Sequence, residues 1–166
     1  MRTIDETDGR IIGILQADAR VANAEIARQV GMAPSATLER VRKLETQGVV
    51  RGYAAAIDPH AVGLGLLAFV SVRAQGTAST PQDSTESLLA AIPEVLEVHH
   101  VAGEDCFLLK VRASDTEALG RLLRQRIAVI PTVIGTRTTI VLETVKETTA
   151  LPLPATHDDT GGRRDG

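Results

Sequence analysis

At 166 residues, with 43% hydrophobic and 2% aromatic residues, the chain can bury apolar cores but favours two small aliphatic domains over one large one. Its single cysteine, Cys106, excludes an intrachain disulfide and a cysteine cluster for zinc, and its net charge of −3 excludes strong bulk attraction to DNA. The charged N-terminus lacks the apolar core of a signal peptide, and the longest apolar run, residues 61–70, is too short to span a bilayer. We therefore expect a cytoplasmic protein without a membrane segment.

The first predicted helix begins at Asp5, whose side chain suits an N-cap, and the acids of its first turn suit the positive end of the helix dipole. Ile11, Ile12 and Leu15 form its apolar face. Residues 17–22 then turn into the next helix.

Residues 23–42, NAEIARQVGMAPSATLERVR, are typical of a helix-turn-helix. Asn23 can cap a short helix, and Gly31 can end it in the left-handed conformation. Pro34 suits the first position of a second helix, which Gly48 ends. Helical spacing predicts one apolar stripe at Ile26, Ala27 and Val30 and another at Leu38, Val41 and Leu44, with Glu45 on the same side.

Polar and basic side chains lie opposite the stripe of the second helix, as in a helix that enters a major groove. Residues 49–57 have the β-branched and aromatic content of a strand or wing, where Arg51 can meet a backbone phosphate. The pattern alone fits equally well an ordinary helix pair whose basic side chains are solvated. The predicted DNA-binding residues are Ser35, Thr37, Arg40, Arg42, Lys43 and Arg51.

The stretch VGMAPSATLERVRKLETQGVVRGYAAAIDPHAVG resembles the leucine-responsive/AsnC (Lrp/AsnC) family of bacterial and archaeal transcription regulators. The resemblance covers residues 4–146 and implies a winged helix-turn-helix joined to a ferredoxin-like amino-acid-sensing domain. Ala33 departs from the family, which often has a serine N-cap there, and loss of such a cap typically costs about 1 kcal/mol of helix stability. Ser35 and Thr37 remain available for phosphate contacts.

Asp58 and Pro59 end the predicted strand or wing, and the composition changes from His60. We therefore predict a DNA-binding domain over residues 1–58, a hinge over 59–65 and a second domain over 66–147. The second domain has the order strand, helix, strand, strand, helix, strand, which is the split βαβ arrangement of an α+β fold with both helices on one face of an antiparallel sheet. Its open aliphatic face invites a second copy, so we expect a homodimer. The predicted elements are residues 66–73, 84–92, 95–102, 106–112, 116–130 and 133–143, with a loop at 76–83.

Residues 148–166 contain two prolines, two adjacent glycines and little to bury, so we expect a disordered tail. Arg163 and Arg164 offer the alternative of a tail that touches DNA, although nearby acids offset their charge.

The remaining candidates for chemistry favour structural roles. His99 and His100 point to opposite faces of a strand, so they cannot jointly bind one metal. Cys106 lies in the apolar strand CFLLKV without an activating base, which favours a packed thiol over a nucleophile. Gly63 and Gly65 lack the third glycine, the lysine and the following helix of a phosphate loop. We expect no catalysis, no metal and no cofactor.

The turn VAGEDC, between the second and third strands of the second domain, is different. The family resemblance implies that a free amino acid binds there between dimers, with Gly103 and Asp105 as the corresponding glycine and acid. A glycine lets a ligand approach the backbone, and a carboxylate can pair with an ammonium group. An ordinary hairpin turn is the alternative. The expected effector set is His100, Val101, Ala102, Gly103, Glu104 and Asp105, with Thr136 and Thr138 from a neighbouring subunit, whose hydroxyls can bond a carboxylate.

The leading hypothesis is a sequence-specific DNA-binding transcription regulator whose assembly or DNA affinity responds to a small amino acid. Its expected partners are double-stranded DNA with a pseudo-palindromic operator, and further copies of itself as a dimer, tetramer or octamer. The alternative is an amino-acid-binding regulatory subunit of an enzyme complex, which would have no use for a basic recognition helix. A DNA-architectural protein without an effector response is a third possibility.

Overall fold

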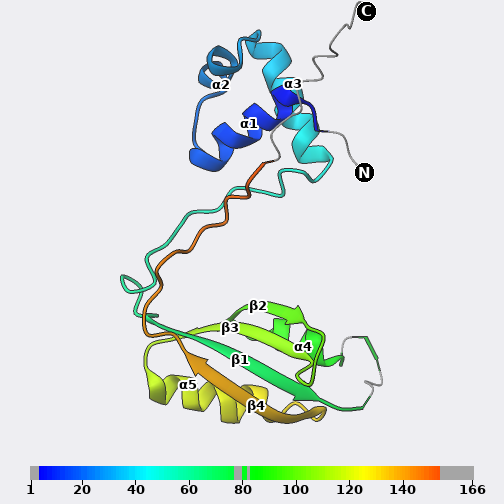
Figure 1. Cartoon of the computed structure of the whole chain (residues 1–166), viewed down its shortest axis with the longest axis vertical. Coiled ribbons are helices and arrows are strands. Elements are labelled where there is room, and N and C mark those ends of the chain that lie inside the picture. The colour runs from blue at the N-terminus through cyan, green and yellow to red at the C-terminus, as the bar shows by residue number, and fades with distance from the viewer. Residues whose placement is uncertain (1–3, 77–79, 82, 154–166) are drawn as a thin grey trace, which may run out of the picture. The chain divides into compact units, whose positions relative to one another are not determined.

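The chain forms two compact units in the computed structural model, which describes residues 4–76, 80–81, 83 and onward to 153 (Figure 1). One unit comprises Met1–Ala55 with Glu147–Gly166, and the other comprises Ala56–Lys146. The boundary after Ala55 falls just before residue 58, where the DNA-binding domain was predicted to end. The boundary after Lys146 places the C-terminal segment with the N-terminal helices, which the sequence did not lead us to expect.

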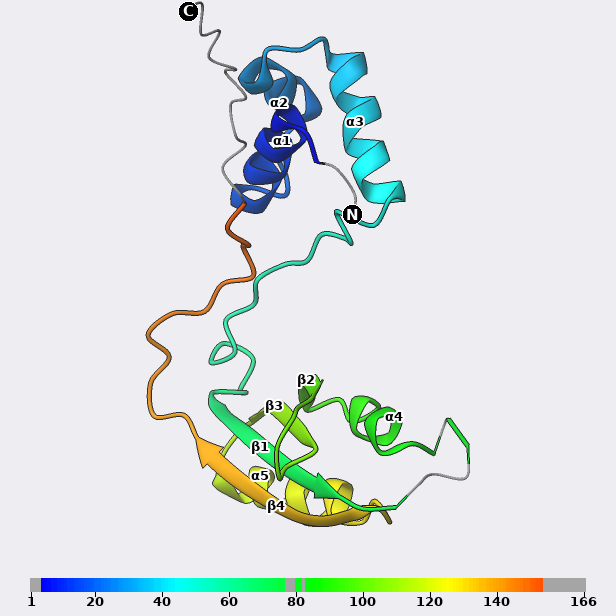
Figure 2. The same cartoon turned by 45° about the vertical axis from the view of Figure 1, so that its right-hand side comes forward.

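Three helices make up the first unit: α1 (Glu6–Ala17), α2 (Asn23–Val30) and α3 (Pro34–Thr46). Figure 2 shows α3 alongside the other two. Asp5 caps α1 as expected, because its side chain accepts the backbone N–H of Asp8 at 2.7 Å. The helices share a small aliphatic core of Ile11, Ile12, Ile26, Val30, Val41 and Leu44.

The start of α2 differs from the prediction. The N-cap is Ala22, and Asn23 is the first helical residue. The Asn23 side chain instead donates from Nδ2 to the Pro34 carbonyl at 2.8 Å, which ties the start of α2 to the start of α3. Gly31 ends α2 in the left-handed region, at φ 73°, as expected.

The buried face of α3 differs from the predicted stripe at one position. Leu38 is 37% exposed, whereas Thr37 is fully buried and lies on the same face as Val41 and Leu44. Positions 37 and 38 both border the stripe formed by Val41 and Leu44, at four and three residues from Val41, so helical spacing allows either to be buried.

The strand predicted over residues 49–57 is wrong. The N–H groups of Val49 and Val50 both donate to the Leu44 carbonyl, at 2.9 and 3.2 Å, so these residues wrap around the end of α3. Residues 51–57 are largely extended and exposed, and no strand in the described part of the chain pairs with them. A β-branched sequence cannot form a strand without a ladder partner, so the wing is absent from this stretch.

The second unit consists of β1 (Leu66–Ala74), α4 (Thr85–Ala90), β2 (Val95–His100), β3 (Phe107–Ala113), α5 (Thr116–Leu122), η1 (Leu123–Ile127) and β4 (Val133–Ile140). Its four strands form an antiparallel sheet in the order β2-β3-β1-β4, which confirms the predicted α+β arrangement. The helix predicted over 116–130 is divided: α5 gives way to a π-helical turn, η1, that ends at Ile127. Part of the predicted loop at 76–83 lies outside the described residues.

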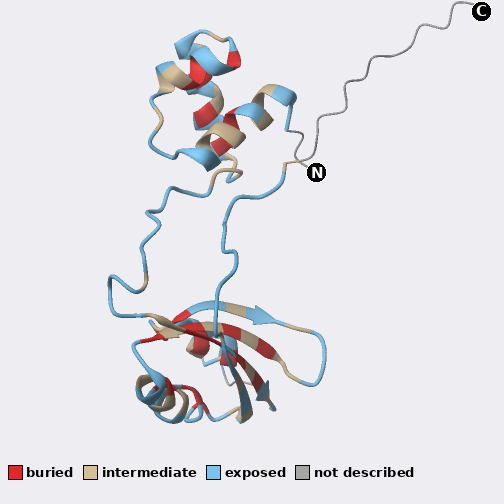
Figure 3. Ribbon diagram, turned by 60° about the vertical axis from the view of Figure 1, so that its left-hand side comes forward, coloured by how far each residue is buried: buried red, intermediate tan, exposed pale blue. Residues whose placement is uncertain are grey.

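Both helices cover one face of this sheet, because their apolar residues share a single core with alternate strand residues (Figure 3). Val70 and Leu109 are fully buried there, against Leu89 of α4 and Ile127 of η1. The opposite face was expected to be aliphatic, and this is only partly correct. Leu67, Phe69 and Leu108 lie on it, together with the charged residues Lys110 and Arg112.

The described part of the predicted tail is ordered against α1, contrary to expectation. The Gln16 side chain accepts the Leu151 N–H at 2.6 Å and donates to the Leu151 carbonyl at 3.1 Å. Leu153 packs against the helical core, with its Cδ1 4.0 Å from the position that a Cβ on Gly13 would occupy. A short apolar segment can therefore be ordered by one amide clamp and one buried side chain. Residues 154–166, including Arg163 and Arg164, lie outside the described residues.

We predict that Leu153→Ala will speed amide hydrogen exchange in α1 in the full chain, measured by mass spectrometry. Half-burying a leucine against the core stabilises the unit by about 1 kcal/mol, so its loss exposes α1 amides more often. Leu142→Ala is the matched control, because Leu142 is 98% exposed in the same C-terminal part of the chain. Equal protection of α1 in the two variants would show that this contact carries no stability.

Candidate DNA-binding and effector sites

The exposed surface of α3 carries part of the predicted DNA-binding set. Ser35, Arg42 and Lys43 are exposed, as is Arg51 in the segment that follows. Thr37 is not available: it is fully buried, and its hydroxyl donates to the Ala33 carbonyl at 3.1 Å. The prediction that Thr37 meets phosphate is therefore wrong. Helical spacing did not distinguish Thr37 from Leu38 because a threonine can be buried when its hydroxyl is satisfied within the helix.

Arg40 is engaged within the helical unit. Its Nη1 lies 2.6 Å from Oδ2 of Asp5 and 2.7 Å from Oδ1 of Asp8. The hydrogen bonds to Asp5 and Asp8 raise the pKa of Arg40, and the pKa of Asp5 is lowered first by the Asp8 N–H and then by Arg40. The side chain is one-third exposed, so it joins α3 to the start of α1 while keeping an edge toward solvent.

Arg40 thus has a positioning role that the sequence did not indicate. Asp5 and Asp8 were interpreted as a cap and as acids at the dipole, and nothing in their spacing pointed to a residue more than thirty positions away. Their shared partner, Arg40, fixes α3 relative to α1. Base contact by Arg40 stays a prediction. It would require the guanidinium to contact the base while still bonded to Asp5 and Asp8, or to leave these two carboxylates.

We predict that Asp8→Asn will lower the melting temperature and weaken DNA binding in a mobility-shift assay. Removing a negative charge should by itself strengthen DNA binding. A weaker affinity would therefore indicate that α3 is no longer held in its position. The pair is partly buried, and about 1 kcal/mol is the expected cost. Glu39→Gln is the matched control, since Glu39 is an exposed acid on α3 itself. Tighter DNA binding by Asp8→Asn with unchanged melting would contradict the positioning role.

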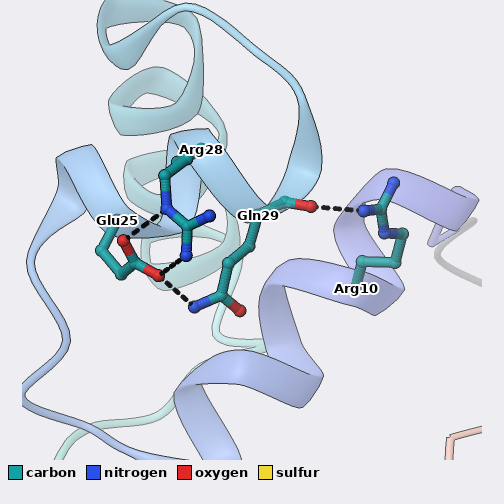
Figure 4. A network of polar contacts seen from close by, with 4 residues as sticks. All are labelled: Arg10, Glu25, Arg28 and Gln29. Atoms are coloured by element: carbon teal, nitrogen blue, oxygen red, sulfur yellow. Dashed lines mark hydrogen bonds and ion pairs between the residues drawn. The ribbon is translucent and has the colours of Figure 1, made fainter.

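A hollow of about 600 Å³ lies between α1 and α2, and α3 contributes no residue to it. Arg10 of α1 donates to the Gln29 carbonyl at 2.5 Å, while Glu25 accepts from Arg28 and from the Gln29 side chain (Figure 4). The hydrogen bond from Arg28, followed by that from Gln29, lowers the pKa of Glu25 to about 2. Neighbouring helical residues satisfy this network, so we assign it to helix packing.

The predicted effector turn lies between β2 and β3. Gly103 has φ 137°, a conformation that side chains rarely adopt, and the Val101 N–H donates to the Cys106 carbonyl at 3.0 Å to close the turn. Ala102, Gly103 and Glu104 are exposed. At its end, Oδ2 of Asp105 lies 2.7 Å from Nη2 of Arg137 in β4. The predicted anchor for an ammonium group therefore already has a cationic partner in its own chain.

The other predicted effector residues outside the turn lie on the helix-covered face of the sheet. Thr136 and Thr138 pair with Val72 and Val70 of β1, which places them on the helix-covered face of the edge strand. This agrees with the expectation that the two threonines share one face. The His100 ring stacks on Phe107 at the base of the turn, with ring centroids 5.0 Å apart. Arg137, between the threonines, is on the opposite face and was missed because the sequence shows no link to Asp105.

The histidines and the cysteine have ordinary structural partners. His99 lies 3.0 Å from Glu97, on the face opposite His100, as expected from strand alternation. The Cys106 thiol is half-buried against the sheet core and donates to the Ala74 carbonyl. Among the residues that the structure describes, no three histidine, cysteine or acidic side chains could hold a metal ion, and no helix has the length and apolar character needed to cross a membrane.

Sequence comparison agrees with both halves of this architecture. The AsnC-type helix-turn-helix domain matches residues 4–45, and the Lrp/AsnC ligand binding domain matches residues 67–151. The leucine-responsive regulatory proteins of Klebsiella pneumoniae and Escherichia coli are 37% and 36% identical to this chain over 150 residues, which span 90% of the chain and 92% of each relative. The chain belongs to the Lrp/AsnC family. It is therefore a transcriptional regulator of that type, with a helix-turn-helix domain and a ligand-binding domain.

Solved Lrp/AsnC structures have the same fold. A transcriptional regulator from Neisseria meningitidis, determined as a complex with L-methionine, is 34% identical with a TM-score of 0.85 and covers 92% of this chain and 98% of its own. The feast or famine regulatory protein of M. tuberculosis, also complexed with L-methionine, is 40% identical with a TM-score of 0.81 and covers 90% of this chain and 99% of its own. The E. coli AsnC structure is 28% identical with a TM-score of 0.82, covering 91% of this chain and all of its own.

Proposed function

We propose that this Lrp/AsnC regulator binds a specific DNA sequence through the exposed face of α3. The observation that carries the proposal is the family's helix-turn-helix at residues 4–45, in which Ser35, Arg42 and Lys43 project from α3 toward solvent. A basic face on the second helix of this motif suits contact with base edges and phosphates in the major groove. Arg51 adds a cation immediately after α3. The protein would act in the cytoplasm.

Self-association is part of this proposal. Phe69 and Leu108 on the uncovered sheet face would be buried by a second copy, which makes a homodimer the minimum unit and allows tetramers or octamers. Two-fold related recognition helices would read a pseudo-palindromic operator, with half-sites about one helical turn or a multiple of it apart. The helix-turn-helix makes an enzyme's regulatory subunit the weaker interpretation.

We predict that Lys43→Ala will weaken binding to the DNA upstream of the protein's own gene, measured by mobility shift at several salt concentrations. Removing one phosphate-binding cation should reduce the slope of log affinity against log salt by roughly one. Arg126→Ala is the control, because it removes one exposed charge from the other unit. If Lys43→Ala leaves affinity and slope unchanged while the wild type binds, α3 does not dock as proposed.

We further propose that a free amino acid binds at residues 100–105 and alters assembly or DNA affinity. Support comes from the ligand-binding domain at residues 67–151, from the positive-φ Gly103 in an exposed turn, and from the Asp105 carboxylate beside it. Two relatives of the same fold were solved with L-methionine bound. Thr136 and Thr138 of a neighbouring subunit are retained as candidate partners for the ligand carboxylate.

We predict that at least one of the twenty amino acids will raise the melting temperature of the wild type and not that of Asp105→Asn. A ligand that binds only the native state stabilises it by mass action, by about 2.7 kcal/mol at a hundred times its Kd. DNA binding by Asp105→Asn should persist without ligand, because the two sites lie in different units. Glu143→Gln is the matched control, because it removes an exposed acid of the same unit outside the turn. Equal stabilisation of wild type and Asp105→Asn would remove Asp105 as the anchor.

A further inference from the structure

The Asp105–Arg137 ion pair brings together an anion and a cation, which are the partners that the ammonium and carboxylate groups of an α-amino acid require. Register places Arg137 opposite Ser71 of β1, whereas Thr136 is opposite Val72, so Arg137 points to the face away from the helices. Asp105 approaches from the start of β3, where the Cys106 N–H donates to the Val72 carbonyl at 2.9 Å. Carboxylate and guanidinium therefore meet across β1, 2.7 Å apart.

This pair is open to solvent at the edge of the sheet. The Arg137 side chain is 76% exposed and that of Asp105 is 27% exposed. An exposed ion pair contributes only about 0–1 kcal/mol, so a ligand can separate its members at small cost. The effector turn adjoins the pair directly, because Gly103 and Glu104 immediately precede Asp105.

A second guanidinium lies beside the first. Arg73 of β1 is opposite Gly135, and its Nη2 is 3.4 Å from the position of a Cβ on Gly135, so Arg73 lies across the β4 backbone next to Arg137. The absence of a side chain at Gly135 leaves room for this arrangement. In the described part of the chain Arg73 forms no ion pair. The single negative charge of Asp105 therefore leaves one of the two arginine charges at this corner unbalanced.

We propose that the effector binds as a zwitterion by entering between Asp105 and Arg137, with its ammonium on the Asp105 carboxylate and its carboxylate on the Arg137 guanidinium. This inference rests on the proposed amino-acid site and adds Arg137 to it. The exchange leaves neither protein charge unpaired, and a guanidinium can hold a carboxylate through two parallel hydrogen bonds. An amine without a carboxylate would occupy Asp105 and leave Arg137 without its partner, so the site selects free α-amino acids.

The test compares L-methionine with L-methioninamide, which keeps the ammonium and lacks the carboxylate, on the full-length protein by calorimetry. The wild type should prefer L-methionine by about tenfold or more, since hydrogen bonds to charged groups are among the stronger ones. Arg137→Gln should weaken L-methionine binding by a similar factor and reduce the preference to less than about threefold. Arg137→Lys, which keeps the charge, should retain part of it.

Arg121→Gln is the matched control. Arg121 forms a 2.6 Å ion pair with Glu117 in the same unit, so the substitution removes an equivalent surface pair from α5, outside the turn. Its preference should equal that of the wild type. Melting curves without ligand verify that each variant is folded.

Two results would overturn the inference. Equal affinity of the wild type for L-methionine and L-methioninamide would show that no cation binds the ligand's carboxylate. Unchanged or tighter L-methionine binding by Arg137→Gln would show that Arg137 only competes with the ligand's ammonium group for Asp105. If another amino acid stabilises the wild type and L-methionine does not, that amino acid and its amide replace the pair. Failure of every amino acid to bind would instead refute the proposed effector function, and the inference with it.

Discussion

Helix α1 holds the helical unit together, because the other described parts of that unit are bonded to it. Arg40 joins α3 to the Asp5–Asp8 end, Arg10 joins α1 to the end of α2, and Gln16 clamps Leu151 at the other end. Isolated helices of fewer than about 12 residues are marginal in water, and α2 has eight. The orientation of α3 therefore depends on its contacts with α1, one of which is made by Arg40 beside the surface proposed to meet DNA.

The sheet unit depends on a different constraint, since its helices cover only one face. Alternation places Val70, Val72 and Leu109 in the shared core and leaves the next residues of each strand on the uncovered face. At one corner of that face the strands bring Asp105, Arg137 and Arg73 together from separate parts of the sequence. The fold therefore has both a partly apolar face, which the proposed self-association would bury, and a charged corner next to the turn.

The order of elements was predictable because it depends on local signals. Apolar runs bounded by turn residues indicated the strands, while Gly31 marked the end of one helix and Pro34 the start of the next. Choices between neighbouring residues were not predictable in the same way. Leu38 was predicted to be buried in place of Thr37, because the sequence does not show whether a hydroxyl is hydrogen-bonded inside the helix. Residues 49–57 were predicted as a strand from their composition, but no strand in the described chain pairs with them.

Partnerships between distant residues were harder still. The turn VAGEDC was identifiable as a candidate site, but Arg137 looks like any exposed strand residue until the register across β1 is known. Leu151 and Leu153 were assigned to a disordered tail with little to bury, because their partner, α1, lies at the other end of the chain. Such contacts depend on topology, which spacing along the sequence does not encode.

The return of the C-terminal segment to α1 makes the two units inseparable by a single cut. A fragment ending at Ala55 would keep all three helices but lose Leu153 from its core, and a sensory fragment extended to residue 151, where the family match ends, would carry part of the other unit with it. Exchange of sensory modules between regulators, in evolution or by engineering, would therefore have to transplant two junctions at once. A graft made only at the first junction would leave an apolar gap beside Gly13.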